Sequence, residues 1–198
     1  MLDALRRDLV DTARLAYEEK LFSGTSGNLS LWCEEEEIML ITPTSVRYET
    51  LQPEDVVAMR LDGTIVEGSL APSSEWRMHA EVYLRCPGVK SQVHTHSPYA
   101  TAFAAAHRPI PACLIEMFYF LGGDVPCAAY ARPGTPEVGI ECAKVLKDRG
   151  GCLMNNHGVL AVGDSLSQAL LRAEYIEDAA RISLLAMQLG GPVALPEL

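Results

Sequence analysis

The sequence lacks several features that would place it in common protein classes. It has no apolar run long enough to span a membrane. Its N-terminal segment carries charges throughout and no small-residue cleavage site, so no secretion signal is predicted. None of its six cysteines belongs to a C-x-x-C pair, and we expect reduced, mostly buried thiols in a cytoplasmic protein.

An excess of positive charge is also missing. The chain has 16 lysines and arginines against 26 aspartates and glutamates, which gives a net charge of −10. Such a chain is a poor ligand for nucleic acids and anionic membranes, so we expect neither as a partner. If its substrate is an anion, short-range hydrogen-bond donors must bind it.

The length and composition of the chain fit a single globular domain. The chain has 198 residues, 48% of them hydrophobic, and we expect one domain over residues 1–198. Apolar periodicity and turn residues predict helices and strands mixed along the chain. Helices are expected at 2–21, 72–86, 98–106, 136–149 and 166–187, and strands at 29–32, 38–41, 56–60, 64–68, 89–96 and on both sides of 155–158. Hairpin-like strand pairs favour an α/β fold with a largely antiparallel sheet.

Two histidines stand two positions apart in the stretch QVHTHSPYA, residues 92–100. Residues i and i+2 of a strand point to the same side, so His94 and His96 can place two imidazoles on one metal ion. The alternative is two unrelated polar residues on an exposed face. No glutamate follows as in a cupin, and no H-x-D-H pattern as in a metallo-β-lactamase, so a third ligand must come from elsewhere.

The remaining histidines differ in their surroundings. His157 follows the apolar residues CLM and precedes a glycine, so it can face a cleft from a turn or simply cap backbone carbonyls. His79 shares an apolar helix face with Trp76 and Tyr83, which favours a packed side chain over a ligand. His107 lies in a polar turn and should be exposed. Three imidazoles with one open position are a catalytic zinc arrangement.

Three polar turns are suited to an anion. They are GTSGNLS (24–30), ITPTSV (41–46) and APSSEWRMH (71–79), the last at the start of a helix. Free amides and the helix dipole favour anions at such a position, and hydroxyls add donors. Ordinary capping by serine and ordinary loops are the alternatives.

The order of these segments resembles the class II aldolase family, specifically the L-fuculose-1-phosphate aldolases. The shared segments, from about residue 24 to about residue 185, are SGNLS, ITPTS, PSSEWRMH, VHTH, IPA, the Gly134–Thr135 helix start and NHG. The resemblance implies a three-layer α/β/α domain with a mainly antiparallel central sheet. It also implies a homotetramer with active sites between subunits.

The resemblance assigns roles to particular residues. It implies that His94, His96 and His157 bind Zn²⁺, with Mn²⁺ or Co²⁺ as alternatives, and that Glu75 is the acid/base and also a metal ligand when substrate is absent. The substrate phosphate is then held by Gly27, Asn28, Thr44, Ser45, Ser73 and Ser74. The reaction implied is reversible cleavage of a ketose 1-phosphate to dihydroxyacetone phosphate and a small aldehyde.

The residues expected to contact the aldehyde half of the substrate differ from those of the fuculose aldolases. They carry a tyrosine where this chain has Ile115, and the following residues offer Glu116 and Tyr119 as an aldehyde pocket. A 5-deoxy-pentulose or methylthio-pentulose phosphate is therefore as plausible a substrate as fuculose phosphate. Two alternatives stay open: a dehydratase of methylthioribulose 1-phosphate that uses Glu116, and a non-catalytic, adducin-like interaction module.

Overall fold

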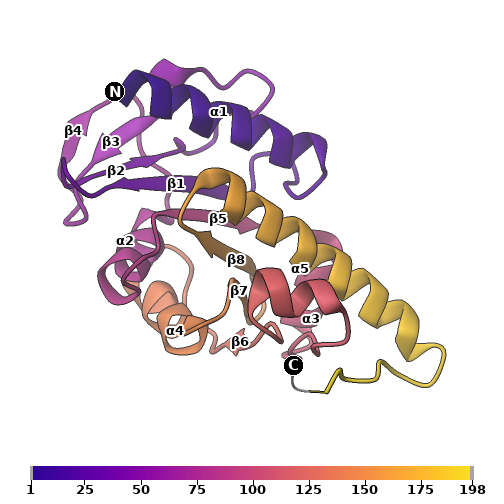
Figure 1. The fold of residues 1–198 in the computed structure, drawn as a ribbon. Coiled ribbons are helices and arrows are strands. Elements are labelled where there is room, and N and C mark those ends of the chain that lie inside the picture. Colours follow the sequence, from indigo (N-terminus) through magenta and orange to yellow (C-terminus); the bar gives the residue numbers. More distant parts are fainter. Residues whose placement is uncertain (1, 197–198) are drawn as a thin grey trace.

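The computed structural model describes residues 2–196, and one eight-stranded sheet runs through them with helices on both faces (Figure 1). The strands are β1 (Asn28–Cys33), β2 (Ile38–Ile41), β3 (Val57–Met59), β4 (Ile65–Glu67), β5 (Ser91–Thr95), β6 (Cys127–Ala128), β7 (Gly151–Met154) and β8 (Gly158–Gly163). The helices are α1 (Leu2–Glu18), α2 (Trp76–Arg85), α3 (Pro98–Ala105), α4 (Pro136–Leu146) and α5 (Leu166–Met187), with a 3-10 turn η1 (Pro53–Asp55) and a π-helical turn η2 (Met117–Leu121).

The sheet has the order β4-β3-β2-β1-β5-β8-β7-β6. Neighbouring strands are antiparallel except β6 and β7, which are parallel. Among the described residues, no helix combines the length and hydrophobicity needed to cross a bilayer.

Side chains on the strands alternate between two cores. On β2, Leu40 joins the cluster that α1 and α5 cover, whereas Met39 and Ile41 join a cluster on the opposite face with Tyr83 of α2. Strand β8 is buried on both faces in the same way, with Leu160 against α2 and α4. The predicted α/β class, with a mainly antiparallel sheet between two helical layers, is confirmed.

Helix α2 starts later than predicted, at Trp76 rather than at Pro72. Pro72 forms an isolated β-bridge with Pro43, and the Ser73 amide donates to the Thr42 carbonyl at 3.0 Å. Residues 71–73 therefore pair with the residues that follow β2 before the helix begins. This extension brings the 71–74 turn against the 42–45 turn.

The register of the central strands sets the positions of polar residues. Asn28 of β1 lies directly opposite His94 of β5, and Thr95 of β5 lies opposite Val159 of β8. Met154 of β7 pairs with Gly158 of β8, and residues 155–157 form the turn between these two strands. Because β8 also pairs with β5, this turn lies next to the end of β5. The predicted H-x-H strand is therefore at the centre of the sheet, with Asn28 of β1 on one side and the Asn-His-Gly turn on the other.

Candidate metal centre

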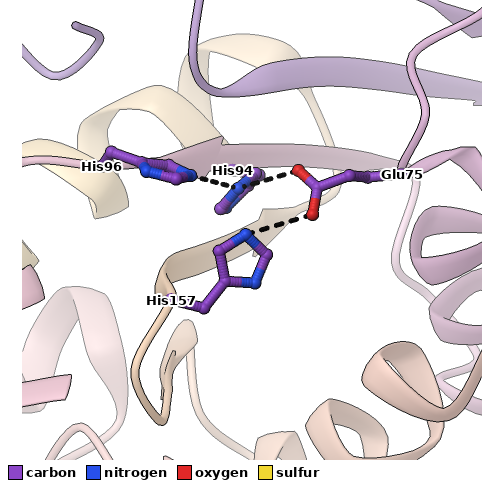
Figure 2. Close-up of side chains that lie close together, drawn as sticks. All are labelled: Glu75, His94, His96 and His157. Atoms are coloured by element: carbon purple, nitrogen blue, oxygen red, sulfur yellow. Dashed lines mark hydrogen bonds and ion pairs between the residues drawn. The ribbon is translucent and has the colours of Figure 1, made fainter. Parts of the chain in front are cut away.

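Four side chains point toward one another at the end of β5 (Figure 2). The Nε2 atom of His94 lies 3.0 Å from Nε2 of His96 and 3.1 Å from Oε2 of Glu75. Nε2 of His157 lies 3.1 Å from the other oxygen, Oε1, of Glu75. All four ligand atoms fall within 4.8 Å of one another, so the structure brings together the four residues of the predicted metal site.

Each member of this cluster is held by rigid backbone. His94 is on β5 and has no exposed surface, and His96 follows the strand directly. His157 closes a tight turn in which Asn156 adopts a left-handed φ of 56°, a conformation that asparagine tolerates. Glu75 is the residue immediately before α2 and is 9% exposed.

The hydrogen bonding of His94 fixes its tautomer. Nδ1 of His94 lies 2.8 Å from the Val159 carbonyl, which only accepts, so Nδ1 carries the proton and Nε2 presents a lone pair to the cluster. That lone pair faces another imidazole nitrogen and a carboxylate oxygen, and Oε1 of Glu75 is buried without a hydrogen-bond partner. Lone pairs and a carboxylate at such short distances repel one another unless a cation lies between them.

A divalent transition-metal ion fits this donor set. Three imidazoles and a carboxylate are ligands that Zn²⁺ accepts, and nitrogens bound to a tetrahedral Zn²⁺ lie about 3.3 Å apart. The observed separation of 3.0 Å between the His94 and His96 nitrogens is close to that spacing. The backbone carbonyl behind His94 is the kind of outer partner that orients a metal-binding histidine.

The cluster shifts the pKa values of its members. Burial alone raises the pKa of Glu75, but the imidazoles of His94 and His157, whose Nε2 atoms each lie 3.1 Å from one of its oxygens, outweigh burial and hold the pKa well below its usual range. Burial, followed by repulsion from His94 and His157, lowers the pKa of His96 to about 4. Glu75 is therefore an anion and His96 a neutral base at neutral pH.

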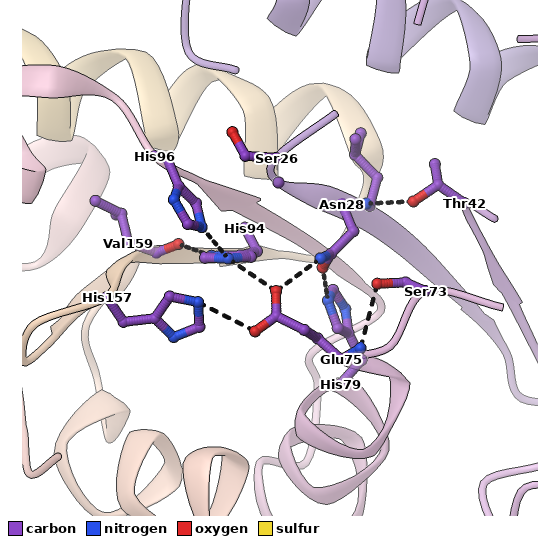
Figure 3. Close-up of polar contacts among 12 residues, drawn as sticks. Ser26, Asn28, Thr42, Ser73, Glu75, His79, His94, His96, His157 and Val159 are labelled. Atoms are coloured by element: carbon purple, nitrogen blue, oxygen red, sulfur yellow. Dashed lines mark hydrogen bonds and ion pairs between the residues drawn. The ribbon is translucent and has the colours of Figure 1, made fainter. Parts of the chain in front are cut away.

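The three predicted polar turns meet beside this cluster (Figure 3). Asn28 donates from Nδ2 to Oε2 of Glu75 at 3.0 Å, and Oγ of Ser73 accepts from the Glu75 amide at 3.3 Å. Thr42 links the second turn to β1, since its Oγ1 accepts from the Leu29 amide at 3.2 Å. The turns thus form one polar wall on the Glu75 side of the cluster.

Glycine is required in the first turn. Gly27 has a φ of +83°, and a Cβ there would lie 2.5 Å from the Phe22 ring and 2.8 Å from the His94 carbonyl. Its own carbonyl accepts from the Tyr48 hydroxyl at 2.6 Å. The residues Thr44, Ser45 and Ser74 of the other two turns are exposed, and the hydroxyls of Thr44 and Ser45 lie 3.5 Å from each other.

His79 is fully buried, as the sequence indicates, and it is not one of the clustered residues. It nevertheless contacts the site, because its Nε2 is hydrogen-bonded to Oδ1 of Asn28 (Figure 3). Sequence reasoning missed this link. Its only local signal is that His79 follows Glu75 by four residues, which places both on one side of a helix.

The predicted aldehyde-pocket residues lie apart from these contacts. Glu116 is half-buried at the start of η2, and Tyr119 within η2 is 76% exposed. Neither belongs to the four-residue cluster found among residues 2–196. His107 is exposed, as predicted, and contacts Asn156 rather than the cluster.

Comparison with known proteins agrees with this geometry. The sequence profile of the family described as class II aldolase and adducin N-terminal domain matches residues 7–184. The chain belongs to this family. The 5-deoxy-D-ribulose 1-phosphate aldolase of Bacillus thuringiensis serovar kurstaki is 34% identical over 197 residues, which cover 100% of this chain and 92% of that protein.

Two further proteins are equally similar to this class II aldolase. The 5-methylthioribulose-1-phosphate/5-deoxyribulose-1-phosphate aldolase of Rhodospirillum rubrum is 36% identical, over 98% of this chain and 86% of that one. A solved L-fuculose 1-phosphate aldolase superposes with a TM-score of 0.92 at 36% identity, covering 97% of this chain and 90% of that chain. The predicted family and aldolase activity are confirmed.

Proposed function

We propose that the chain is a metal-dependent aldolase that reversibly cleaves a ketose 1-phosphate to dihydroxyacetone phosphate and a small aldehyde. The observation that carries the proposal is the meeting of three imidazole nitrogens and one buried carboxylate within 4.8 Å, next to a wall of polar turns. His94, His96 and His157 would hold the metal, which we expect to be Zn²⁺, together with Glu75 when no substrate is present.

Breaking the C3–C4 bond of the sugar, one carbon away from the C2 carbonyl, leaves an enediolate on the three-carbon fragment. A divalent cation held by the three histidines would supply a Lewis acid that stabilises this negative charge. The histidines keep their Nε2 lone pairs turned inward, as the Val159 carbonyl does for His94. Their rigid placement on β5 and the β7–β8 turn limits the reorganisation needed when substrate arrives.

Glu75 is the group that we assign to proton transfer at C3 of the three-carbon product. Its carboxylate is ionised, nearly buried and adjacent to the cluster, so in the synthetic direction it removes a C3 proton of dihydroxyacetone phosphate. In the cleavage direction the same group, in its protonated form, returns that proton to the enediolate carbon and ends as the carboxylate. Substrate oxygens would take its place among the histidines. The Asn28 amide and the Ser73 hydroxyl hold the carboxylate and the backbone of Glu75 on that side.

The phosphate would bind the wall formed by Gly27, Asn28, Thr44, Ser45, Ser73 and Ser74. Asn28 uses one of its two Nδ2 protons for Glu75, so the second is free to donate to a ligand. Binding by neutral donors suits a chain of net charge −10, which cannot attract an anion over long distance.

The substrate class follows from the relatives. Two of them are named for 5-deoxyribulose or methylthioribulose 1-phosphate and one for fuculose 1-phosphate, and all three sugars share the ketose 1-phosphate half. We propose that Glu116 and Tyr119 contribute to the aldehyde side and that a short, 5-deoxy or 5-methylthio sugar is preferred. Ile115 presents an apolar surface that is 41% exposed and suits such a sugar end.

A screen of the three ketose 1-phosphates tests this function. Release of dihydroxyacetone phosphate is followed by coupled reduction, and the carbon products are identified by NMR. An aldolase yields dihydroxyacetone phosphate and an aldehyde in equal amounts. Loss of water with the carbon chain intact would instead assign the dehydratase reaction and make Glu116 the first residue to mutate.

Three further expectations belong to this proposal. We propose that residues 1–198 form one class II aldolase-like domain, although residues 1, 197 and 198 lie outside the described part. We also propose a cytoplasmic homotetramer with active sites between subunits. Size measurement in solution tests the assembly, and elemental analysis of protein purified without chelator tests the metal.

A further inference from the structure

A chain of buried hydrogen bonds leads from Glu75 away from the active site (Figure 3). Asn28 contacts Glu75 through Nδ2 and His79 through Oδ1. Nδ1 of His79 lies 2.6 Å from Oγ of Ser30, which lies 2.7 Å from the Tyr83 hydroxyl. His79 and Ser30 have no exposed surface, and Asn28 is only 4% exposed.

The chemistry of each group allows one direction of donation. An ionised carboxylate only accepts, so Asn28 must present its amide N–H to Glu75 and its oxygen to His79. The His79 Nε2 must then carry a proton, and Nδ1 must accept one from the Ser30 hydroxyl. Tyr83 in turn donates to Ser30, because the Ser30 proton is already used.

We propose that His79 is a positioning residue, which fixes the amide orientation of Asn28 and thereby holds the Glu75 carboxylate facing the histidines. This rests on the proposed function of Glu75. Without the His79 donor, the Asn28 amide can turn over and present its oxygen to the carboxylate. Two acceptors would then repel each other, and Glu75 would lose its position.

The surroundings of His79 also hold its ring in place. Asn28 lies opposite His94 in the sheet and cannot move away without breaking the β1–β5 pairing. His79 stands one helical turn after Glu75, and Gln92 donates from Nε2 to its backbone carbonyl at 2.8 Å. The ring is thus fixed from the helix, from β1 and from β5.

Two variants of His79 test the proposal through proton exchange at C3 of dihydroxyacetone phosphate in deuterated water. His79→Gln retains an N–H donor near the Nε2 position, whereas His79→Leu does not. We expect His79→Leu to lower the exchange kcat about 10- to 100-fold, as is typical for partners behind a metal site, and His79→Gln to restore most of it. Equal rates for the two variants, whether high or low, would overturn the proposal.

A second pair of variants covers the case in which His79→Leu fails to fold. Ser30→Ala removes the donor to His79, and Ser91→Ala removes a hydroxyl that is equally buried on β5 but has no hydrogen-bond partner. We expect only Ser30→Ala to slow exchange. Equal exchange rates in both serine variants would contradict the proposal.

A spectroscopic measurement separates this inference from the proposed function. Nitrogen-15 NMR of labelled histidines in the metal-free protein reports the tautomer of His79, which is assigned by its loss in His79→Gln. We expect protonation on Nε2; protonation on Nδ1 would overturn the proposal even if exchange is normal. If wild-type protein catalyses no exchange, the aldolase function fails, and the tautomer still decides whether the hydrogen-bond chain exists as described.

Discussion

Gly158 is the position where the smallest substitution should do the most damage to the metal centre. A Cβ there would lie 2.4 Å from the Thr95 carbonyl oxygen, 3.2 Å from Cε1 of His94 and 3.4 Å from Cδ2 of His96. The first contact is roughly 1 Å shorter than ordinary van der Waals contact and involves backbone of the central strand. Gly158→Ala must therefore push β8 and His157 away from β5.

The expected magnitude follows from the cost of overpacking. Inserting a methyl group into a tightly packed site costs about 1–3 kcal/mol of unfolding free energy. Because metal ligands tolerate only about 0.2 Å of displacement, we expect at least about tenfold weaker metal binding as well. Urea unfolding of the metal-free protein and metal titration against a competing chelator measure the two effects.

Gly88→Ala is the matched control. Gly88 has a φ of +92° with no atom within 4 Å of the added Cβ, so alanine there costs about 1 kcal/mol through backbone strain alone. It lies beyond the end of α2 opposite to Glu75. We expect lower stability with unchanged metal affinity. Wild-type metal affinity and stability in Gly158→Ala would refute the reasoning.

Two other predictions concern stability and substrate binding. Burial lowers the pKa of His79 to about 3, so below about pH 6.5 the unfolded chain binds a proton that the folded protein excludes, and stability falls as the pH falls. When the pH is lowered from 7.5 to 5, the metal-free wild-type protein should therefore lose about 2 kcal/mol more unfolding free energy than His79→Gln. Equal losses for the two proteins, measured by urea unfolding, would rule this out. Ser73→Ala should chiefly raise KM, because a hydrogen bond to a charged group contributes roughly 1.5–3 kcal/mol. Steady-state kinetics with inorganic phosphate as a competitor measure this effect, and an unchanged KM with unchanged inhibition would show that the prediction is wrong.

Part of the four-residue cluster could be predicted from local sequence signals. Alternation of apolar residues places β5, and two histidines two residues apart on one strand must share a side. The apolar residues before His157 and the glycine after it indicate a turn held by strands. The convergence of these segments was implied only by the order of the family motifs, and the antiparallel pairing of β5 with β8 is what brings them together.

The hydrogen-bond chain behind Glu75 could not be predicted in the same way. Its contacts join His79 to Ser30 and Asn28, which are 49 and 51 residues earlier in the chain. They depend on the register between β1 and β5 and on the angle at which α2 leaves the sheet edge. The segment that leads into α2 is held by the bridge between Pro43 and Pro72, which no local pattern in the sequence specifies.

The measurement that tests the central claim most directly is exchange of the C3 proton of dihydroxyacetone phosphate with deuterated water, followed by NMR. The account predicts exchange by wild-type protein, loss of exchange after chelation, recovery on adding back Zn²⁺, Mn²⁺ or Co²⁺, and a fall of about 10²–10⁴-fold in metal-loaded Glu75→Gln. Full exchange by metal-stripped protein, or near wild-type exchange by Glu75→Gln, would contradict it.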